Sequence, residues 1–284
     1  MAGESKSHEA RTDIPETLAR SRALQASRKL RDEQRVFFIE GIRNFLSALD
    51  HEWEIESVLY SERLLTSGIA RSKVRSLVRQ GIPTVKLSPE EFRSISTTQQ
   101  ASGVAALVKQ HTWPVDYGGL ARGPLWLVVQ HLQSNGNLGA LLRTSTAVGG
   151  CGLVVVGKEV DPFNPDLIRA SMGSFFAQKI IATTALELKA HCRKHSIQVV
   201  GACPKASSTH FEFDFKQPSL IVLGNERTGL SPELRDLCTD FVYIPMAEPV
   251  DSLNVSVAGS VLMYEAMRCV LQKEPQKRHP SNTC

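Results

Sequence analysis

Polar side chains gather at three places in the C-terminal half of this 284-residue chain, each beside an apolar run. Asn137 and Arg143 lie in the segment NGNLGALLRT, Glu226 lies in GNERTG, and Ser252 and Asn254 lie in DSLNVSVA. Amides, a hydroxyl, one carboxylate and one guanidinium suit polar recognition and phosphate binding better than they suit a free-standing nucleophile. The three segments together predict one ligand site.

Each segment also has a simpler structural explanation, which the sequence alone leaves open. Asn137 is placed to cap a helix over 138–148, and Ser252 and Asn254 are both placed to cap a helix over 255–271. Glu226 lies in a glycine-bounded loop between a strand and a helix. Arg143 lies in mid-helix beside apolar neighbours, so we expect it at a rim, paired with an acid, or binding a phosphate.

The elements that must position these residues alternate between apolar strands and helices. We predict strands over 125–132, 153–156, 179–183, 198–202, 220–223 and 241–244, and helices over 138–148, 165–172, 185–195, 232–238 and 255–271. This alternation predicts βαβ crossovers and a parallel sheet. Such sheets bind ligands at the carboxyl ends of their strands, and the polar segments follow the strands over 125–132, 220–223 and 241–244.

The N-terminal half predicts a separate α/β unit. Its strands are expected over 35–41, 55–60, 84–87 and 103–108, with helices over 18–30, 42–49 and 72–80 and from Ser88 onward. We therefore divide the chain into a flexible N-terminus (1–15), a first domain (16–110), a linker (111–124), a second domain (125–273) and a flexible C-terminus (274–284).

Composition limits the class of protein. There is no apolar run of membrane-spanning length and no signal peptide, so a cytoplasmic protein without a membrane partner is expected. The six cysteines are scattered and the histidines form no ligand pattern, so no disulfide framework or metal site is predicted. P-loop, GxGxxG and GxSxG motifs are absent, which gives no support to nucleotide hydrolysis, dinucleotide binding or serine hydrolysis.

Net charge is only +4, but the basic residues are unevenly distributed. The segment from Arg63 to Lys86 holds six basic residues and no acid. Such a run is either a solvated helix face or a surface for phosphates. The candidate RNA-binding residues are Arg63, Arg71, Lys73, Arg75 and Arg79, with Arg28 and Lys29 from the first predicted helix and Arg31 just after it.

The three polar segments, in this order, resemble motifs of the SpoU/TrmH branch of the SPOUT RNA methyltransferases. The resemblance covers about 125–271 and is most specific in Ile244-Pro245-Met246 followed by SLNVS at 252–256. The segment FFIEG at 37–41 also resembles the first strand of the ribosomal-protein-like domain that binds RNA in this family. One departure is the segment QSNG at 133–136, which replaces the usual Asp-Pro and puts the shape of that loop in question.

The resemblance implies a fold, a reaction and partners. The expected fold is α/β, with an N-terminal ribosomal-protein-like RNA-binding domain and a C-terminal SPOUT domain that contains a deep trefoil knot and forms a homodimer. Physical reasoning alone would not predict a knot. The expected reaction is methylation of a ribose 2′-hydroxyl by S-adenosylmethionine, most readily in large-subunit rRNA, with avilamycin or thiostrepton resistance as one outcome. The alternatives are a tRNA substrate and a non-catalytic RNA-binding protein.

The resemblance also assigns residues. The implied catalytic set is Asn137, Arg143, Glu226, Ser252 and Asn254, with Arg143 orienting the phosphate and hydroxyl of the target. A guanidinium is too basic to accept a proton readily, so the proton acceptor is left open. The implied cofactor residues are Leu223, Gly224, Asn225, Ile244, Pro245, Met246, Ser252 and Leu253.

Overall fold

The computed structural model describes residues 13–116, 119–250 and 252–273, and the chain divides into two compact units at Gln110. Of the predicted flexible ends, residues 1–12 and 274–284 lie outside the described residues, as does Asp251. Helix α1 (Ile14–Ala26) begins inside the N-terminal segment predicted to be flexible, with Pro15 and Glu16 in its first turn. Both residue types are favourable there, because proline fixes a helical φ and an acid interacts well with the helix dipole.

The first unit has a four-stranded sheet with helices on both faces. Its strands are β1 (Val36–Glu40), β2 (Ile55–Tyr60), β3 (Thr84–Lys86) and β4 (Val104–Lys109), in the order β1-β4-β2-β3. Only β2 and β3 pair in parallel. The helices after α1 are α2 (Arg28–Gln34), α3 (Ile42–Asp50), α4 (Gly68–Arg79) and α5 (Pro89–Arg93).

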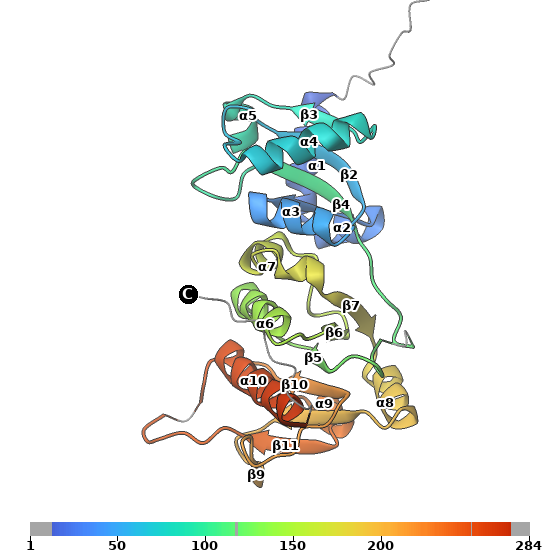
Figure 1. The fold of residues 1–284 in the computed structure, drawn as a ribbon, viewed down its shortest axis with the longest axis vertical. Coiled ribbons are helices and arrows are strands. Elements are labelled where there is room, and N and C mark those ends of the chain that lie inside the picture. The colour runs from blue at the N-terminus through green and yellow to red at the C-terminus, as the bar shows by residue number, and fades with distance from the viewer. Residues whose placement is uncertain (1–12, 117–118, 251, 274–284) are drawn as a thin grey trace, which may run out of the picture. The chain divides into compact units, whose positions relative to one another are not determined.

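Strand β1 shows why both faces of this sheet are covered. Phe38 packs in a core cluster with Leu24 of α1 and Phe92 of α5. Phe37, which points to the opposite face, makes an edge-to-face contact with Trp53, with ring centroids 5.9 Å apart. In Figure 1, α3 and α4 lie in front of this sheet and α1 lies behind it.

The single basic helix predicted over 18–30 is wrong, because the chain breaks at Ser27. Ser27 has extended backbone angles, φ −119° and ψ 110°, and its hydroxyl accepts a hydrogen bond from the Leu30 N–H at 3.2 Å. Serine is a favourable N-cap, so a new helix begins after it.

The second unit has a seven-stranded sheet in which every pairing is parallel. The order is β7-β6-β5-β10-β8-β11-β9. The strands are β5 (Leu125–Val129), β6 (Gly152–Val156), β7 (Lys179–Thr183), β8 (Gln198–Ala202), β9 (Ser208–Thr209), β10 (Ser219–Leu223) and β11 (Asp240–Tyr243). The helices are α6 (Asn135–Ala147), α7 (Pro165–Ala170), the 3₁₀ helix η1 (Ser174–Ala177), α8 (Ala185–Lys194), α9 (Pro232–Leu237) and α10 (Val255–Lys273).

Helices cover both faces of this sheet. Leu188 of α8 and Leu234 of α9 join one core cluster with strand residues such as Val128 and Val222. Helices α6 and α10 pack together on the other face (Figure 1). The α/β fold with a parallel sheet that the sequence predicted is therefore confirmed. Within the described residues, no helix is both long and apolar enough to cross a membrane.

Residues 111–124 do not behave as a linker where the structure describes them. The backbone N–H of Trp113 donates to the carbonyl of Ile180 at 2.8 Å. Leu120 is 0 % exposed and belongs to the same core cluster as Trp126. The backbone bond of Trp113 and the burial of Leu120 attach the segment to the second unit.

Candidate active site

A pocket of about 250 Å³ lies at the carboxyl edge of the second unit's sheet. Its walls come from the loops that follow β8, β10 and β11 and from the start of α10. These three strands are neighbours in the sheet, and because all are parallel, their carboxyl ends meet at one edge. The predicted cofactor residues that line the pocket are Leu223, Gly224, Asn225, Ile244, Met246, Ser252 and Leu253. Pro245 is not among the lining residues.

The loop after β10 is closed into a tight turn by its own backbone. Asn225 and Gly229 exchange two backbone hydrogen bonds of 2.9 Å each. A Cβ atom on Gly224 would lie 2.2 Å from the carbonyl carbon of Gly229, so only glycine fits there. The Asn225 side chain accepts hydrogen bonds from the backbone of Arg227 and Thr228 at 2.9 and 3.1 Å. Asn225 therefore fixes the loop that carries Glu226.

Three of the predicted catalytic side chains are joined by hydrogen bonds beside this pocket. The Asn137 amide nitrogen donates to Glu226 Oε1 at 3.1 Å. The Asn254 amide nitrogen donates to Asn137 Oδ1, also at 3.1 Å. Asn137 is thus both donor and acceptor at the centre of the set, and we name Asn137, Glu226 and Asn254 the polar cluster.

The caps of α6 and α10 explain why the side chains of Asn137 and Asn254 can form the hydrogen bonds of the polar cluster. Ser134 caps α6 by accepting a hydrogen bond from the Asn137 N–H at 3.2 Å, so the idea that Asn137 is the cap is wrong. Asn254 has a double role, because its Oδ1 also accepts from the backbone N–H of Ser256 at 2.8 Å at the start of α10. One residue therefore supplies both a cap and a contact to α6.

The structure leaves Arg143 apart from the polar cluster. It follows Asn137 by six residues on α6, which places it roughly 120° around the helix from Asn137. Its side chain is exposed and makes no hydrogen bond or ion pair with any residue that the structure describes. Of the three environments expected from the sequence, pairing with an acid is not observed among the described residues, and the exposed guanidinium is available to an anion. Ser252 is exposed and lines the pocket.

Close packing and side-chain contacts fix α10, which carries one side of the site. A Cβ atom on Gly259 would lie 2.5 Å from Leu141 Cδ2, so α10 approaches α6 closely there. The hydroxyls of Thr144 and Ser260 lie 2.8 Å apart across the same contact. These contacts hold Asn254 within reach of Asn137.

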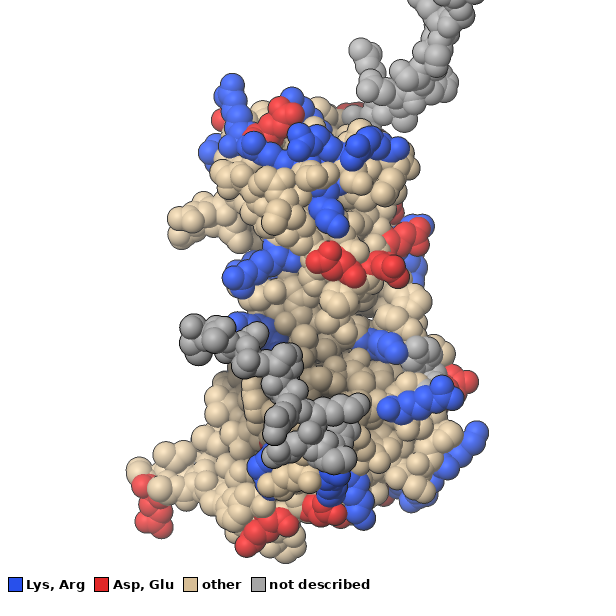
Figure 2. All heavy atoms as spheres, in the orientation of Figure 1, with Lys and Arg blue, Asp and Glu red and all other residues tan. Residues whose placement is uncertain are grey.

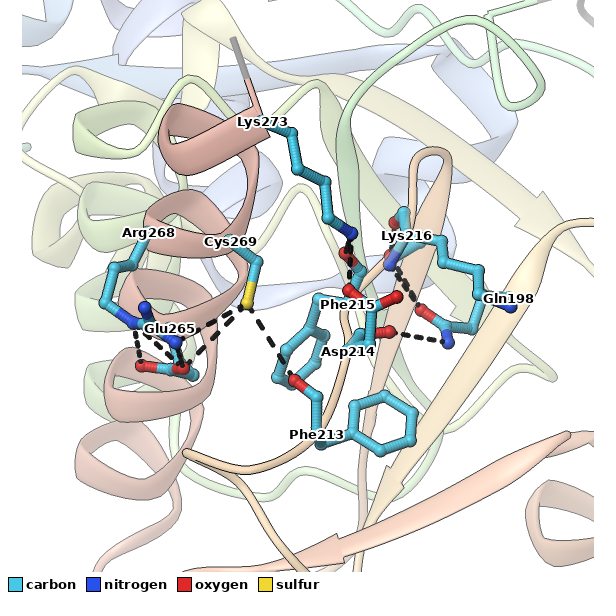
Figure 3. Close-up of polar contacts among 10 residues, drawn as sticks. Gln198, Phe213, Asp214, Phe215, Lys216, Glu265, Arg268, Cys269 and Lys273 are labelled. Atoms are coloured by element: carbon cyan, nitrogen blue, oxygen red, sulfur yellow. Dashed lines mark hydrogen bonds and ion pairs between the residues drawn. The ribbon is translucent and has the colours of Figure 1, made fainter.

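The C-terminal half of α10 is held by the segment 213–215 (Figure 3). Cys269 Sγ lies 3.8 Å from the carbonyl oxygen of Phe213, and Lys273 forms an ion pair with Asp214. On α10 itself, the Arg268 Nε donates to Glu265 at 3.0 Å, and this bond lowers the pKa of the Glu265 carboxyl. The ion pair with Lys273 likewise lowers the pKa of Asp214.

One wall of the pocket was missed by the sequence analysis. Ala202, the last residue of β8, and the following Cys203 and Pro204 line the pocket together with Val255 and Ala258 of α10. The end of the strand predicted over 198–202 was the one indication of this wall in the sequence. Local sequence patterns do not reveal that β8 lies between β10 and β11. In the described part of the chain, no group of three or more His, Cys, Asp or Glu residues could hold a metal ion.

The predicted RNA-binding residues of the first unit differ in their surroundings. Arg63, Arg75 and Arg79 are exposed and have no ion pair within the described residues. Basic side chains gather over the part of the unit where α4 runs (Figure 2). Although no acid occurs between Arg63 and Lys86 in the sequence, folding brings Asp50 within 4.0 Å of Lys73 and Glu62 within 2.6 Å of Lys86. Part of the basic run is therefore neutralised.

The candidate residues on α2 fit RNA binding less well. Arg28 lies 3.4 Å from Asp32, and Lys29 lies 3.7 Å from Glu33. Arg31 requires a correction, because its side chain is only 2 % exposed and donates to the carbonyl of Gln25 at 3.0 Å. Its guanidinium stabilises the turn between α1 and α2 and does not face solvent.

Comparison with known proteins identifies relatives that match most of the chain. Residues 124–264 match the family model of the SpoU rRNA Methylase family, and residues 18–106 match the MRM3-like substrate binding domain. The chain is 30% identical over 253 residues to a 23S rRNA (uridine(2479)-2'-O)-methyltransferase of Streptomyces viridochromogenes, with 87% of each chain covered.

Solved structures of similar proteins agree with the family match. The SpoU methyltransferase AviRb of Streptomyces viridochromogenes in complex with AdoMet is similar with a TM-score of 0.78 and 28% identity, covering 90% of this chain and 99% of that chain. An AdoMet-bound rRNA methyltransferase from Sinorhizobium meliloti is similar with a TM-score of 0.78 and 28% identity, covering 89% of this chain and 94% of that chain. The protein described here therefore belongs to the SpoU rRNA methylase family.

Proposed function

We propose that this protein transfers the methyl group of S-adenosylmethionine to a ribose 2′-hydroxyl of RNA, and that the RNA is large-subunit rRNA. The observation that carries the proposal is the polar cluster, which lies beside a pocket at the carboxyl edge of a parallel sheet. Relatives that share nearly the whole length of the chain, including its N-terminal unit, support the rRNA substrate.

The pocket residues fit the adenosyl group of the cofactor. Leu223, Val242, Ile244, Met246 and Leu253 provide apolar surface for an aromatic ring. The glycine-bounded turn at Gly224 brings backbone groups to the edge of the pocket, where they can bind the polar edge of an adenine. When bound there, S-adenosylmethionine supplies a methyl group that its sulfonium already activates.

The protein's contribution is to align the hydroxyl and to remove one proton. In our proposal, Asn137, Glu226 and Asn254 bind the target ribose, and their mutual hydrogen bonds hold them in place before the RNA arrives. Arg143 binds the neighbouring phosphate. Because a guanidinium stays protonated, we expect the hydroxyl proton to leave to a phosphate oxygen or to water.

Methyl transfer from labelled cofactor to unmodified rRNA and tRNA tests this proposal. Label should appear as a 2′-O-methylated nucleoside of large-subunit rRNA. Arg143→Ala should lower the transfer rate by about 100-fold and leave cofactor binding nearly intact, because it removes substrate alignment only. Arg169→Ala is the matched control, because Arg169 is an exposed arginine on α7 bonded to Asp166 at 2.9 Å.

The possible outcomes separate the alternatives. Label in tRNA alone would correct the substrate, and no label in any RNA would favour a non-catalytic RNA-binding protein. Near-normal transfer by Arg143→Ala would remove Arg143 from the mechanism without affecting the reaction assigned to the protein.

The exposed arginines along α4 are proposed to contact the rRNA backbone. Clustered cations gain affinity for a polyanion by releasing its counterions, so binding should weaken as salt increases. Arg79→Glu should raise the KM for RNA and make its salt dependence shallower, because Arg79 is exposed and has no ion pair within the described residues. If the KM for RNA and its salt dependence both stay unchanged, the basic segment from Arg63 to Lys86 is only a solvated helix face.

We also propose that the protein is a homodimer that associates through α10. Val257, Tyr264 and Leu271 are 49%, 50% and 56% exposed, and their spacing of seven residues aligns them along one face of the helix. A groove of about 880 Å³ lined by Tyr264, Leu271 and other α10 residues runs along this face. An exposed row of apolar side chains of this kind suits an interface between two copies of the chain.

Light scattering of the purified protein tests the dimer. We expect twice the chain mass for the native protein and the monomer mass for Tyr264→Arg, whereas Leu186→Arg, at an exposed leucine on α8, should leave the dimer intact. A native monomer would refute the interface. The trefoil knot, the cytoplasmic location and a drug-resistance phenotype stay predictions.

A further inference from the structure

A second pocket lies in the first unit, where the end of β2 meets α4. Its volume is about 300 Å³. Tyr60, the last residue of β2, lines it together with the apolar side chains of Leu65, Val74 and Val78. Leu65 and Val74 are buried, whereas Val78 is 51% exposed. The backbone of Tyr60 is fixed, because its carbonyl accepts a hydrogen bond from the Leu87 N–H at 2.8 Å.

Charged groups surround this apolar hollow. The Arg71 Nε donates to the carbonyl of Leu65 at 2.6 Å, and its Nη2 donates to the carbonyl of Glu62 at 3.1 Å. These two bonds hold the guanidinium in one orientation and leave Nη1 without a partner among the described residues. Arg75, one turn further along α4, is exposed and has no ion pair in the described part of the chain. The Glu62 carboxylate is neutralised by Lys86 at 2.6 Å.

We infer that this pocket binds one unpaired nucleotide of the RNA substrate, with its base against Tyr60 and Val78 and its phosphate on Arg71 and Arg75. Proteins that bind single-stranded RNA combine aromatic side chains, on which bases stack, with arginines that bind the backbone. Cations alone bind any polyanion, whereas an aromatic ring and an exposed valine in the same hollow add a contact that only a base can use.

This inference rests on the proposed function, because it requires RNA as the substrate. It adds the form of the RNA, since a base in a duplex is stacked and cannot enter the pocket. The bound RNA must therefore present a loop, a bulge or a single-stranded end to the first unit.

Binding of a fluorescent probe to the full chain tests the inference without any cofactor. The probe is a single-stranded oligoribonucleotide of about ten nucleotides that contains 2-aminopurine, compared with the same sequence as a duplex. Tyr60→Ala should weaken single-strand binding about tenfold and remove the change in fluorescence that stacking causes. Tyr60→Phe keeps the ring and should keep both signals. Arg93→Ala, at an exposed arginine paired with Glu90, is the control for general charge.

Two results would overturn the inference: equal single-strand binding by Tyr60→Ala and the native protein, or equal losses for the single strand and the duplex. If Tyr60→Ala unfolds, Arg75→Ala and Val78→Glu replace it, because both side chains are exposed. Ring-dependent binding without methyl transfer would refute the proposed function alone. Methyl transfer with binding that does not depend on Tyr60, Arg75 or Val78 would refute the pocket alone.

Discussion

Asn137→Asp is the sharpest perturbation of the polar cluster, because it changes one donor into an acceptor with almost no change in shape. The Asn137 nitrogen that now lies 3.1 Å from Glu226 Oε1 would become a second carboxylate oxygen. Two unit charges at that distance repel by about 1.3 kcal/mol at the dielectric constant of water and about 5 kcal/mol at an effective value of 20. Glu226 is exposed, so the lower value applies.

Adding the lost hydrogen bond gives a total cost of about 2 kcal/mol, which corresponds to about a 30-fold loss in rate if the cluster must stay closed during the reaction. The assay is single-turnover methyl transfer at saturating cofactor and RNA. Combining Asn137→Asp with Glu226→Gln restores a donor–acceptor pair, so we expect thermal stability to return to the native value. The rate should return as well if Glu226 acts only by position. An unchanged rate for Asn137→Asp alone would refute the view that the cluster holds the ribose.

Three further predictions concern the surroundings of the site. Gly224→Ala should weaken cofactor binding measured by calorimetry, because the new Cβ would lie 2.2 Å from the backbone of Gly229, whereas Gly136→Ala, with its nearest contact at 3.6 Å, should not. Arg268 lowers the pKa of Glu265 below its usual 4.5, so their bond stabilises the fold above that pH and is lost as the pH falls through the lowered value. Arg268→Ala should therefore lower the midpoint of thermal unfolding slightly at neutral pH and leave it unchanged in strong acid. Burial raises the pKa values of Cys192 and Cys238 to about 12, so neither thiol should react with iodoacetamide near neutral pH until the protein is denatured, as mass spectrometry would detect.

The sequence predicted most strands of the second unit because buried parallel strands are continuous apolar runs, such as LWLVV at 125–129 and SLIVL at 219–223. It missed β9, which is two polar residues long and forms only by pairing with β11. It also missed the break at Ser27, because the basic residues on both sides have similar helix propensity. The burial of Arg31 follows from that break and could not be read from composition.

In the candidate site too, some features follow from local sequence patterns and others depend on long-range packing. Asn137, Glu226 and Asn254 could be grouped because each follows a strand of one parallel sheet, although their hydrogen bonds could not be foreseen. The cap of α6 was misplaced because the helix begins at Asn135, three residues before its first apolar position. The pocket wall after β8 depends on strand order, which arises from long-range packing and leaves no local pattern.

The polar cluster joins residues that are 89 and 117 positions apart in the chain. Closing loops of that length costs conformational entropy before the contacts repay it, and contacts of such long range slow folding. An intermediate with a complete sheet but an undocked α10 would lack Asn254 and one wall of the pocket. Cofactor binding can therefore serve as a reporter of completed folding, since a kinetically trapped or truncated chain would fail to bind even with most of its secondary structure in place.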